Sequence, residues 1–347
     1  MQYTKLGNTG LIVSRLAFGA MSFTSGNRDI ASVYKVGPEL ASELVGVALD
    51  AGINFFDTAD AYAGGESEIM LGAALKAKRS DVVIATKVGF RTGEPLTQSG
   101  LSRRHILWSV DQSLKRLGTD WIDVFIVHRE DPFTPLEETL ETLDTVVRSG
   151  KVRYLGFSNW SAWKAAASIE MQKANGWATF THGQMNYSLL SRDVERDIIP
   201  MMKYYSLGLN VWSPLAGGFL SGKYTRETKA NADDRLSSYD VLPTDKEAGF
   251  KLIEQIKVIA ERHNSNVPQV AIAWLLSKPI VNSILIGTSK RSQLENNIKA
   301  IDLQLTQEEI AELDETTTPH PVYPNWFIDN AFDQPVAQTL GKFNPMN

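Results

Sequence analysis

Short apolar runs alternate with longer segments of helical period along most of this 347-residue chain. The runs are apolar on both faces, which is typical of parallel strands covered by helices. Six are clear: Asn54–Thr58, Val82–Thr86, Trp121–Val127, Val152–Phe157, Leu209–Ser213 and Asn282–Ile286. Two weaker candidates, Leu16–Met21 and Phe180–Met185, bring the number of predicted strands to eight.

The segments between the runs have helical spacing. Apolar residues recur at steps of three and four in Arg103–Leu117 (Leu107, Val110, Leu114, Leu117) and in the next segment (Leu136, Leu140, Leu143, Val147). Such alternation leaves an open doubly wound sheet or a closed barrel. An open sheet should show G-x-G-x-x-G after its first strand, where this chain has GAMSFTSGNRD. We therefore predict one α/β domain over residues 1–347, a (β/α)8 TIM barrel with its core at about 12–317.

Two segments depart from simple alternation. Phe219–Pro243 is polar and predicts a long loop after the seventh strand. Thr306 and Glu309 have the spacing of a capping box and predict a C-terminal helix that includes Ile310 and Leu313. A tail over residues 318–347 follows, with the aromatic and proline-rich stretch PHPVYPNWFIDNAF.

Composition excludes several classes of function. The chain has no cysteine, so disulfides, thiolate nucleophiles and cysteine zinc sites are excluded. Its five histidines form neither H-x-H nor H-E-x-x-H, and we expect no metal. A net charge of −5 argues against general binding to nucleic acid or anionic lipid. We expect no membrane span and no signal peptide, and therefore a cytoplasmic location.

Candidate catalytic residues follow successive predicted strands, where barrel active sites are built. Asp57 and Tyr62 follow the second strand, Lys87 the third and His128 the fourth. Tyrosine is a poor acid at neutral pH, and the Lys87 ammonium would favour its phenolate form while Asp57 keeps the lysine charged. His128 would orient a substrate carbonyl by a hydrogen bond. We predict that Tyr62 protonates the carbonyl oxygen as a cofactor delivers a hydride to carbon.

Each of these residues has a structural interpretation when taken alone. Asp57 could cap a helix, Lys87 could be solvated, and Tyr62 could pack at the edge of the core. His128 could belong to a surface charge network with the next three residues, Arg129–Asp131. Their occurrence on adjacent strand ends favours the catalytic interpretation.

Seven motifs in order resemble those of the aldo-keto reductases: NFFDTADAYAGGESEIMLG, ATKVG, FIVHRED, GFSNW, QMNYSLL, WSPLAGGFLSGKY and IGTSKRSQLENN. The resemblance runs from about Tyr3 to Thr317. It implies a (β/α)8 barrel that uses NAD(P)H for the reversible reduction of an aldehyde or ketone to an alcohol. It also implies that Asp57, Tyr62, Lys87 and His128 form the catalytic tetrad.

The same resemblance implies a cofactor site. Ser158, Asn159 and Gln184 would hold the nicotinamide carboxamide, and Trp212 would stack on the ring. The phosphates and the adenosine would be contacted by Ser213, Pro214, Leu215, Lys223, Gly287, Thr288, Ser289, Lys290, Gln293 and Asn297. The residues support the last part independently, because Thr288–Arg291 precedes a predicted helix whose N-terminus favours an anion. Lys290, with Arg291, would suit a 2′-phosphate, so NADPH is favoured over NADH.

Three other functions fit parts of the sequence. Gly217–Lys223 nearly spells a Walker A loop, but Tyr224 replaces the required hydroxyl residue, which argues against an NTPase. A metal hydrolase built from Asp57, Asp60 and His128 lacks a histidine cluster. The chain also resembles the potassium channel β subunits, aldo-keto reductase barrels that bind a channel and sense their cofactor. Those proteins have asparagine where this chain has His128, so the histidine favours a reductase over a cofactor-sensing subunit.

The substrate is expected to be a small carbonyl compound or alcohol, aryl or alicyclic, in an apolar pocket. Pocket candidates are Met21, Phe23, Phe90, Trp160, Tyr323, Trp326 and Phe327. Any of these side chains could instead pack the tail onto the barrel. Nothing in the sequence indicates an oligomeric state.

Overall fold

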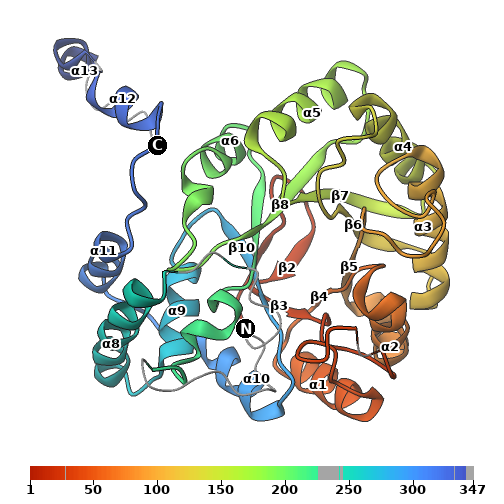
Figure 1. Ribbon diagram of the computed structural model, residues 1–347, viewed down its shortest axis with the longest axis horizontal. Helices are drawn as coiled ribbons and strands as arrows, with labels where there is room; N and C mark the ends of the chain where they lie inside the picture. The colour runs from red at the N-terminus through yellow and green to blue at the C-terminus, as the bar shows by residue number, and fades with distance from the viewer. Residues whose placement is uncertain (28, 226–241, 243–244, 332, 341–347) are drawn as a thin grey trace.

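Eight parallel strands form a closed barrel at the centre of the computed structural model, which describes residues 1–27, 29–225, 242, 245–331 and 333–340 (Figure 1). Each predicted run contributes one strand, including the two weaker candidates. The first and last strands pair with each other and close the barrel. The strands are β3(Leu16–Gly19), β4(Phe55–Asp57), β5(Val83–Val88), β6(Ile122–Val127), β7(Val152–Ser158), β8(Phe180–Asn186), β9(Gly208–Trp212) and β10(Val281–Ile286). The predicted (β/α)8 barrel is confirmed.

Helices surround the barrel as the periodicity predicts (Figure 1). The ring consists of α1(Pro38–Asp50), α2(Glu66–Leu75), α3(Arg103–Leu117), α4(Leu136–Arg148), α5(Ala162–Ala174), α6(Ile198–Tyr204), α9(Val267–Leu276) and α10(Arg291–Ile298). Further helices are α8(Lys246–Arg262), α11(Gln307–Thr316), α12(Asn325–Asn330) and α13(Gln334–Leu340). None of the helices in the described part of the chain is both long and apolar enough to cross a membrane.

Helix α3 has the predicted bounds and buries the predicted Val110 and Leu117, but its buried face also includes residues outside the predicted apolar set. Leu107 is 38% exposed, whereas Ser109 and Ser113 are fully buried. Helix α3 also packs closely on α2, where a Cβ atom added to Gly72 would lie 2.3 Å from the carbonyl oxygen of Leu117. Small serine side chains fit such an approach better than leucine. The inner face of α3 is therefore partly polar.

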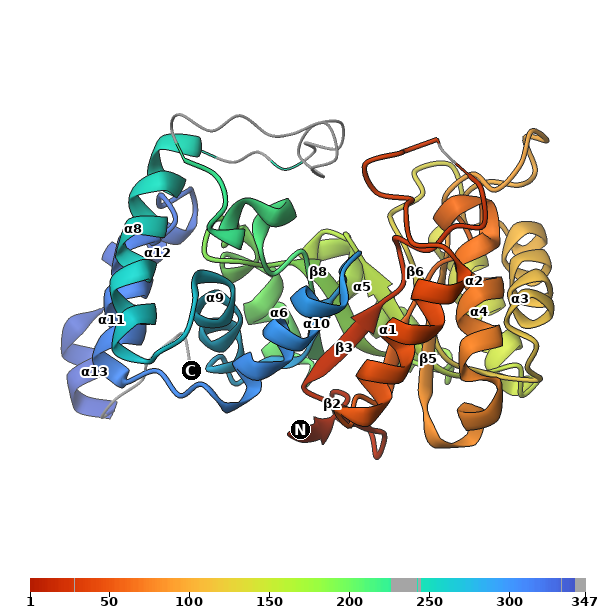
Figure 2. The same ribbon diagram turned by 90° about the horizontal axis from the view of Figure 1, so that it is seen from below.

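The lower half of the barrel interior is apolar and is closed by a hairpin that the sequence did not predict. Strands β1(Tyr3–Lys5) and β2(Ile12–Ser14) pair antiparallel at the end opposite the β–α loops (Figure 2). Leu6 and Val13 from this hairpin pack with Phe55, Val124 and Ile126 inside the barrel, all of them fully buried. This apolar packing closes the end of the barrel opposite the candidate site.

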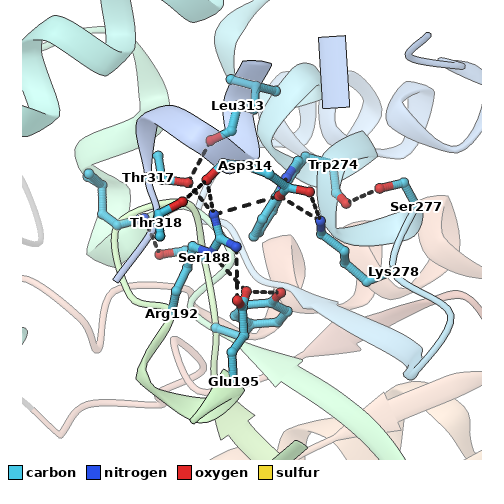
Figure 3. A network of polar contacts seen from close by, with 12 residues as sticks. Ser188, Arg192, Glu195, Trp274, Ser277, Lys278, Leu313, Asp314, Thr317 and Thr318 are labelled. Carbon is cyan, nitrogen blue, oxygen red and sulfur yellow. Dashed lines mark hydrogen bonds and ion pairs between the residues drawn. The ribbon is translucent and has the colours of Figure 1, made fainter. Parts of the chain in front are cut away.

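A polar network outside the barrel ties the segment after β8 to α9 and α11 (Figure 3). Asp314 accepts hydrogen bonds from the indole of Trp274 at 2.9 Å and the ammonium of Lys278 at 2.7 Å. Arg192 donates to the carbonyl oxygen of Asp314 at 2.8 Å and to Glu195 at 2.8 Å. The cations of Lys278 and Arg192 also contact the Trp274 ring, at 4.5 and 5.4 Å. These contacts fix the end of α11, from which the tail leaves.

The two departures from alternation have different outcomes. The capping box of Thr306 and Glu309 is confirmed at the start of α11. The segment after β9 begins as a short helix, η4(Ala216–Ser221), and 226–241 and 243 of the predicted loop lie outside the described residues. In the tail, α12 and α13 lie outside the ring of helices, away from the barrel mouth (Figure 1).

We predict that Leu6→Ala lowers the free energy of unfolding by about 2–5 kcal/mol, because it leaves a cavity where the hairpin closes the barrel. Denaturant unfolding followed by tryptophan fluorescence measures this change. Leu96→Ala is the control, since Leu96 is 85% exposed and its loss should cost less than about 0.5 kcal/mol. Equal effects of the two substitutions would show that the hairpin does not contribute to the core.

Candidate active site

The four predicted catalytic residues meet at the upper end of the barrel. Asp57 ends β4, Lys87 lies in β5, His128 follows β6, and Tyr62 begins the short helix η1(Tyr62–Gly65). The Lys87 ammonium donates to Asp57 Oδ1 at 2.5 Å and to the Tyr62 hydroxyl oxygen at 3.3 Å. It also donates to the carbonyl oxygen of Thr58 at 2.8 Å. Lys87 therefore connects the buried carboxylate to the phenol.

Burial acts against both charges of the Lys87–Asp57 pair. Burial raises the pKa of Asp57, while the ammonium of Lys87 and the amide of Gln184 oppose that rise. Although burial also disfavours the ammonium, the attraction of Asp57 and Tyr62 raises the pKa of Lys87 above its ordinary value. The charged form of Lys87 is therefore favoured beside Tyr62, where an ammonium favours the phenolate form of a tyrosine.

The surroundings of His128 disfavour its charged form. Burial, with the nearby charges of Lys87 and Arg129, holds the pKa of His128 well below its ordinary value. Its ring meets Tyr62 and Phe90 at near right angles, with ring centres 5.6 and 4.7 Å apart. A neutral imidazole still carries one N–H donor. His128 can thus donate a hydrogen bond to a carbonyl oxygen without placing a second positive charge next to Lys87.

A chain of hydrogen bonds joins the residues expected to hold the nicotinamide to the tetrad. The Trp212 indole donates to Asn159 Oδ1 at 3.1 Å, and Asn159 Nδ2 donates to Ser158 Oγ at 3.0 Å. Ser158 Oγ donates to the carbonyl oxygen of Gln184 at 2.7 Å. Gln184 Nε2 in turn donates to Asp57 Oδ2 at 2.7 Å. All five residues lie at or near the C-terminal ends of the barrel strands.

The sequence did not predict the contact between Gln184 and Asp57. Through this contact Gln184 orients the carboxylate that holds Lys87. The two residues are 127 positions apart, so no spacing in the sequence could have shown this contact. Only the closure of the barrel brings β8 opposite β4.

Left-handed backbone conformations gather at the same end of the barrel. Asn159 follows β7 with φ 56°, Ser213 follows β9 with φ 57°, and Ala216 has φ 48°. Ala63, next to Tyr62, has φ 48°. Such conformations are unfavourable for residues with a Cβ atom and persist where the surrounding structure enforces them. These turns set the direction of the side chains that follow the strands in the candidate site.

The segment expected to contact the adenosine is ordered by its own side chains. Thr288 Oγ1 accepts from the Lys290 amide at 3.0 Å and donates to Gln293 Oε1 at 2.7 Å. Lys290 is exposed at the start of α10. The Arg291 guanidinium instead binds Glu295 at 2.7 Å and Glu43 at 3.2 Å. Lys290 is thus better placed than Arg291 to meet a phosphate.

The other expected cofactor residues differ in exposure. Ser213 and Leu215 are half-buried and Gly287 and Ser289 lie at the surface or close to it, whereas Pro214 and Asn297 are buried. Lys223 is exposed, with its ammonium 4.9 Å from the Tyr224 ring. A Cβ atom on Gly287 would lie 3.2 Å from the carbonyl oxygen of Gly19, so the ends of β10 and β3 approach closely here.

The expected substrate pocket is only partly assembled. Phe90 lies against His128, and Met21 packs against the small cluster formed by Val33, Tyr34 and Ala63. Phe23 and Trp160 are instead core residues, 0% and 2% exposed. Phe23 packs on Phe18, and Trp160 packs against the rings of Phe157 and Phe180, so neither side chain offers surface to a substrate.

The three tail aromatics also depart from the expected pocket. Tyr323, Trp326 and Phe327 are 74%, 45% and 53% exposed, and they belong to the tail that leaves the ring of helices (Figure 1). The tail is attached near Arg196, whose backbone oxygen accepts from Asn325 and whose guanidinium donates to the carbonyl oxygen of His320. These contacts lead the tail along the flank of the barrel.

Comparison with known proteins identifies relatives over nearly the whole chain. Residues 15–317 match the sequence profile of the "Aldo/keto reductase family". A "probable voltage-gated potassium channel subunit beta" of Oryza sativa subsp. japonica is 36% identical over 87% of this chain and 92% of its own. "Versiconal hemiacetal acetate reductase" of Aspergillus parasiticus is 35% identical over 93% of this chain and 99% of its own. A "putative aryl-alcohol dehydrogenase" of Schizosaccharomyces pombe is 34% identical over 92% of this chain and 97% of its own.

We predict that Asp57→Ala lowers the free energy of unfolding by about 3–5 kcal/mol, because it leaves the Lys87 ammonium buried without its carboxylate. The Asp57→Ala/Lys87→Met double variant should recover much of this loss. Urea unfolding measures both. The control is Asp111→Ala, which breaks the exposed pair with Lys151 and should cost about 1 kcal/mol or less. A double variant less stable than Asp57→Ala would contradict the assignment of the loss to an unpaired charge.

Proposed function

The chain belongs to the aldo/keto reductase family, and we propose that it is an NADPH-dependent reductase of aldehydes or ketones with Tyr62 as the proton donor. The observation that carries the proposal is the position of Lys87. Its ammonium touches both Asp57 and the Tyr62 hydroxyl, and this contact allows a tyrosine to act as an acid near neutral pH.

The residues of the chain account for the proton side of the reaction. Bound NADPH supplies the hydride that the carbonyl carbon accepts. Tyr62 transfers its phenolic proton to the carbonyl oxygen, and the O–H bond of the phenol breaks as that of the alcohol forms. Lys87 stabilises the resulting phenolate, and the neutral His128 donates a hydrogen bond to the reacting oxygen. In alcohol oxidation the Tyr62 phenolate takes the proton back.

The polar residues beside the tetrad fit a nicotinamide dinucleotide. Gln184 uses its Nε2 on Asp57, which leaves its Oε1 to accept from the carboxamide. Ser158 and Asn159 stand next to it, and the half-buried Trp212 ring offers a stacking surface. At the neighbouring strand end, Lys290 and the start of α10 would hold the 2′-phosphate, which is why NADPH is preferred in this proposal.

The substrate class follows from the side chains next to the proposed proton donor. Phe90 lies against His128 and is 40% exposed, and Met21 packs against the small cluster that contains Ala63. These apolar groups suit an aryl or alicyclic carbonyl compound. The relative named after an aryl-alcohol dehydrogenase is consistent with that class.

A second candidate function is a cofactor-sensing binding subunit, since one of the relatives above is named as a potassium channel β subunit. His128 favours turnover, because it supplies the second contact to the carbonyl oxygen. Purified protein assayed with NADPH and benzaldehyde separates the two. Steady turnover supports the reductase, whereas tight nucleotide binding without turnover of any carbonyl or alcohol in a broad panel supports the binding subunit.

We predict that Tyr62→Phe lowers kcat for benzaldehyde reduction by about 10²- to 10⁴-fold, because the proton donor is removed. The Kd for NADPH, measured by quenching of tryptophan fluorescence, should stay the same. Tyr204→Phe is the matched control, since Tyr204 is 82% exposed on α6. Full activity in Tyr62→Phe would exclude Tyr62 as the proton donor.

We also predict that Lys290→Ala raises the Kd for NADPH by roughly tenfold or more and leaves the Kd for NADH unchanged, because only NADPH has the 2′-phosphate. Arg291→Ala is the comparison and should have a smaller effect, since Arg291 is bound to Glu43 and Glu295. Nucleotide titrations of the purified variants measure both constants. Equal loss of affinity for the two nucleotides would contradict the assigned role.

A further inference from the structure

A cluster of polar side chains is buried behind the loop that carries Tyr62. We call Asp60, Glu68, Thr86, Ser109 and Arg116 the Asp60 cluster. Asp60 is 1% exposed, and Glu68, Thr86 and Ser109 are fully buried. The tetrad uses none of these side chains. The buried serine on the inner face of α3 is one of the features that its apolar periodicity did not predict.

The cluster supports the Tyr62 loop from both sides. At the start of the loop, the Asp60 amide donates to the carbonyl oxygen of Lys87 at 3.2 Å. After Tyr62 the chain passes through three left-handed residues, Ala63–Gly65. A Cβ atom added to Gly65 would lie 2.8 Å from Cδ of Arg116, so that side chain lies directly against the turn. The loop is thus fixed between Asp60 at one end and Arg116 at the other.

The two carboxyl groups of the cluster, Asp60 and Glu68, differ in their hydrogen bonds. Glu68 accepts from the Arg116 guanidinium at 2.5 Å and from the Thr86 hydroxyl at 2.5 Å. The Asp60 oxygens and the Ser109 hydroxyl are buried and none of them has a hydrogen bond of normal geometry, although the Ser109 hydroxyl and the Ala61 amide lie close enough to act on Asp60 as donors. A buried carboxylate whose donors are so poorly aligned is unfavourable, whereas a carboxylic acid can donate its own proton to a hydroxyl oxygen.

The charges around Asp60 agree with an uncharged acid. Glu68 on α2 and Arg116 on α3 are the charged groups that act on it, while the Ser109 hydroxyl and the Ala61 amide, like Arg116, favour its charged form. Burial, together with the negative charge of Glu68, raises the pKa of Asp60 well above its ordinary value. With its proton retained, the cluster holds one carboxylate and one guanidinium and is neutral.

We propose that Asp60 is a positioning residue for Tyr62. As an uncharged carboxylic acid paired with Ser109, it holds the left-handed turn in the form that brings the phenol to Lys87. The inference rests on the proposed role of Tyr62 as proton donor. It assigns a function to a side chain that touches neither substrate nor cofactor.

The first test asks whether Asp60 keeps its proton. An acid whose folded-state pKa lies above the unfolded value costs stability as pH rises from the unfolded pKa, near 4, toward the folded one. The Tm of the wild type should therefore fall relative to that of Asp60→Asn between about pH 5 and pH 8, and the control Asp111→Asn should show no such divergence. A wild-type Tm that instead rises against Asp60→Asn would mean that Asp60 is ionised and stabilised by Arg116, and the proposal would be wrong.

The second test asks whether Asp60 positions Tyr62. Tyr62 ionisation is read as the ultraviolet phenolate absorbance of each protein minus that of its Tyr62→Phe counterpart. Asp60→Ala should raise the midpoint by about one pH unit or more, because the phenol moves away from Lys87. Asp60→Asn should keep the wild-type midpoint. Ser109→Ala, which removes the partner of Asp60, should shift it in the same direction and serves if Asp60→Ala does not fold.

Activity measurements provide a third test. Asp60→Ala should lower kcat for benzaldehyde on the order of 10- to 100-fold and leave the KM for NADPH unchanged. Asp60→Asn should restore kcat. An unchanged Tyr62 midpoint in both Asp60→Ala and Ser109→Ala would overturn the positioning role. The absorbance titration needs no turnover. A protein that reduces no carbonyl yet shows the expected shifts would contradict the proposed reductase and support the role of Asp60.

Discussion

The buried ion pair between Lys87 and Asp57 is the interaction on which the upper end of the barrel depends. Two charges in such a place are tolerated only when further groups satisfy them. Here the carbonyl oxygen of Thr58 and the amide of Gln184 do so, at 2.8 and 2.7 Å. These groups come from β4, β5 and β8, which surround one interior only in a closed barrel. The groups that satisfy Lys87 and Asp57 therefore meet only if the sequence closes the barrel.

The two ends of the barrel differ in their side-chain packing and in their backbone conformation. Below, the hairpin and the strands fill the interior with apolar side chains such as Leu6 and Phe55. Above, residues with Cβ atoms adopt left-handed conformations after β7 and β9 and beside Tyr62. The well-packed half supplies the stability that the unfavourable turns cost. The same division is expected wherever loops of a rigid scaffold carry function.

Features that depend on the spacing of apolar residues could be predicted from the sequence, whereas features that depend on contacts between distant residues could not. All eight barrel strands were visible as apolar runs, and α3 began and ended where predicted. The N-terminal hairpin was not seen, since strands of three residues leave no period to detect. The buried serines of α3, the contact of Gln184 with Asp57 and the core positions of Phe23 and Trp160 each depend on a neighbour distant in the chain. Aromatic type alone could not tell a pocket from a core.

The pairing of β3 with β10 also has a consequence for synthesis. These strands come from opposite ends of the barrel sequence, and their register places Ile284 beside Leu16 and Ile286 beside Phe18. While the chain leaves the ribosome from its N-terminus, β3 has no partner on one side until β10 has emerged. An unpaired strand edge of this kind invites pairing with other chains. The nascent protein is thus most exposed to aggregation just before its last strand arrives, when seven strands of the barrel already exist.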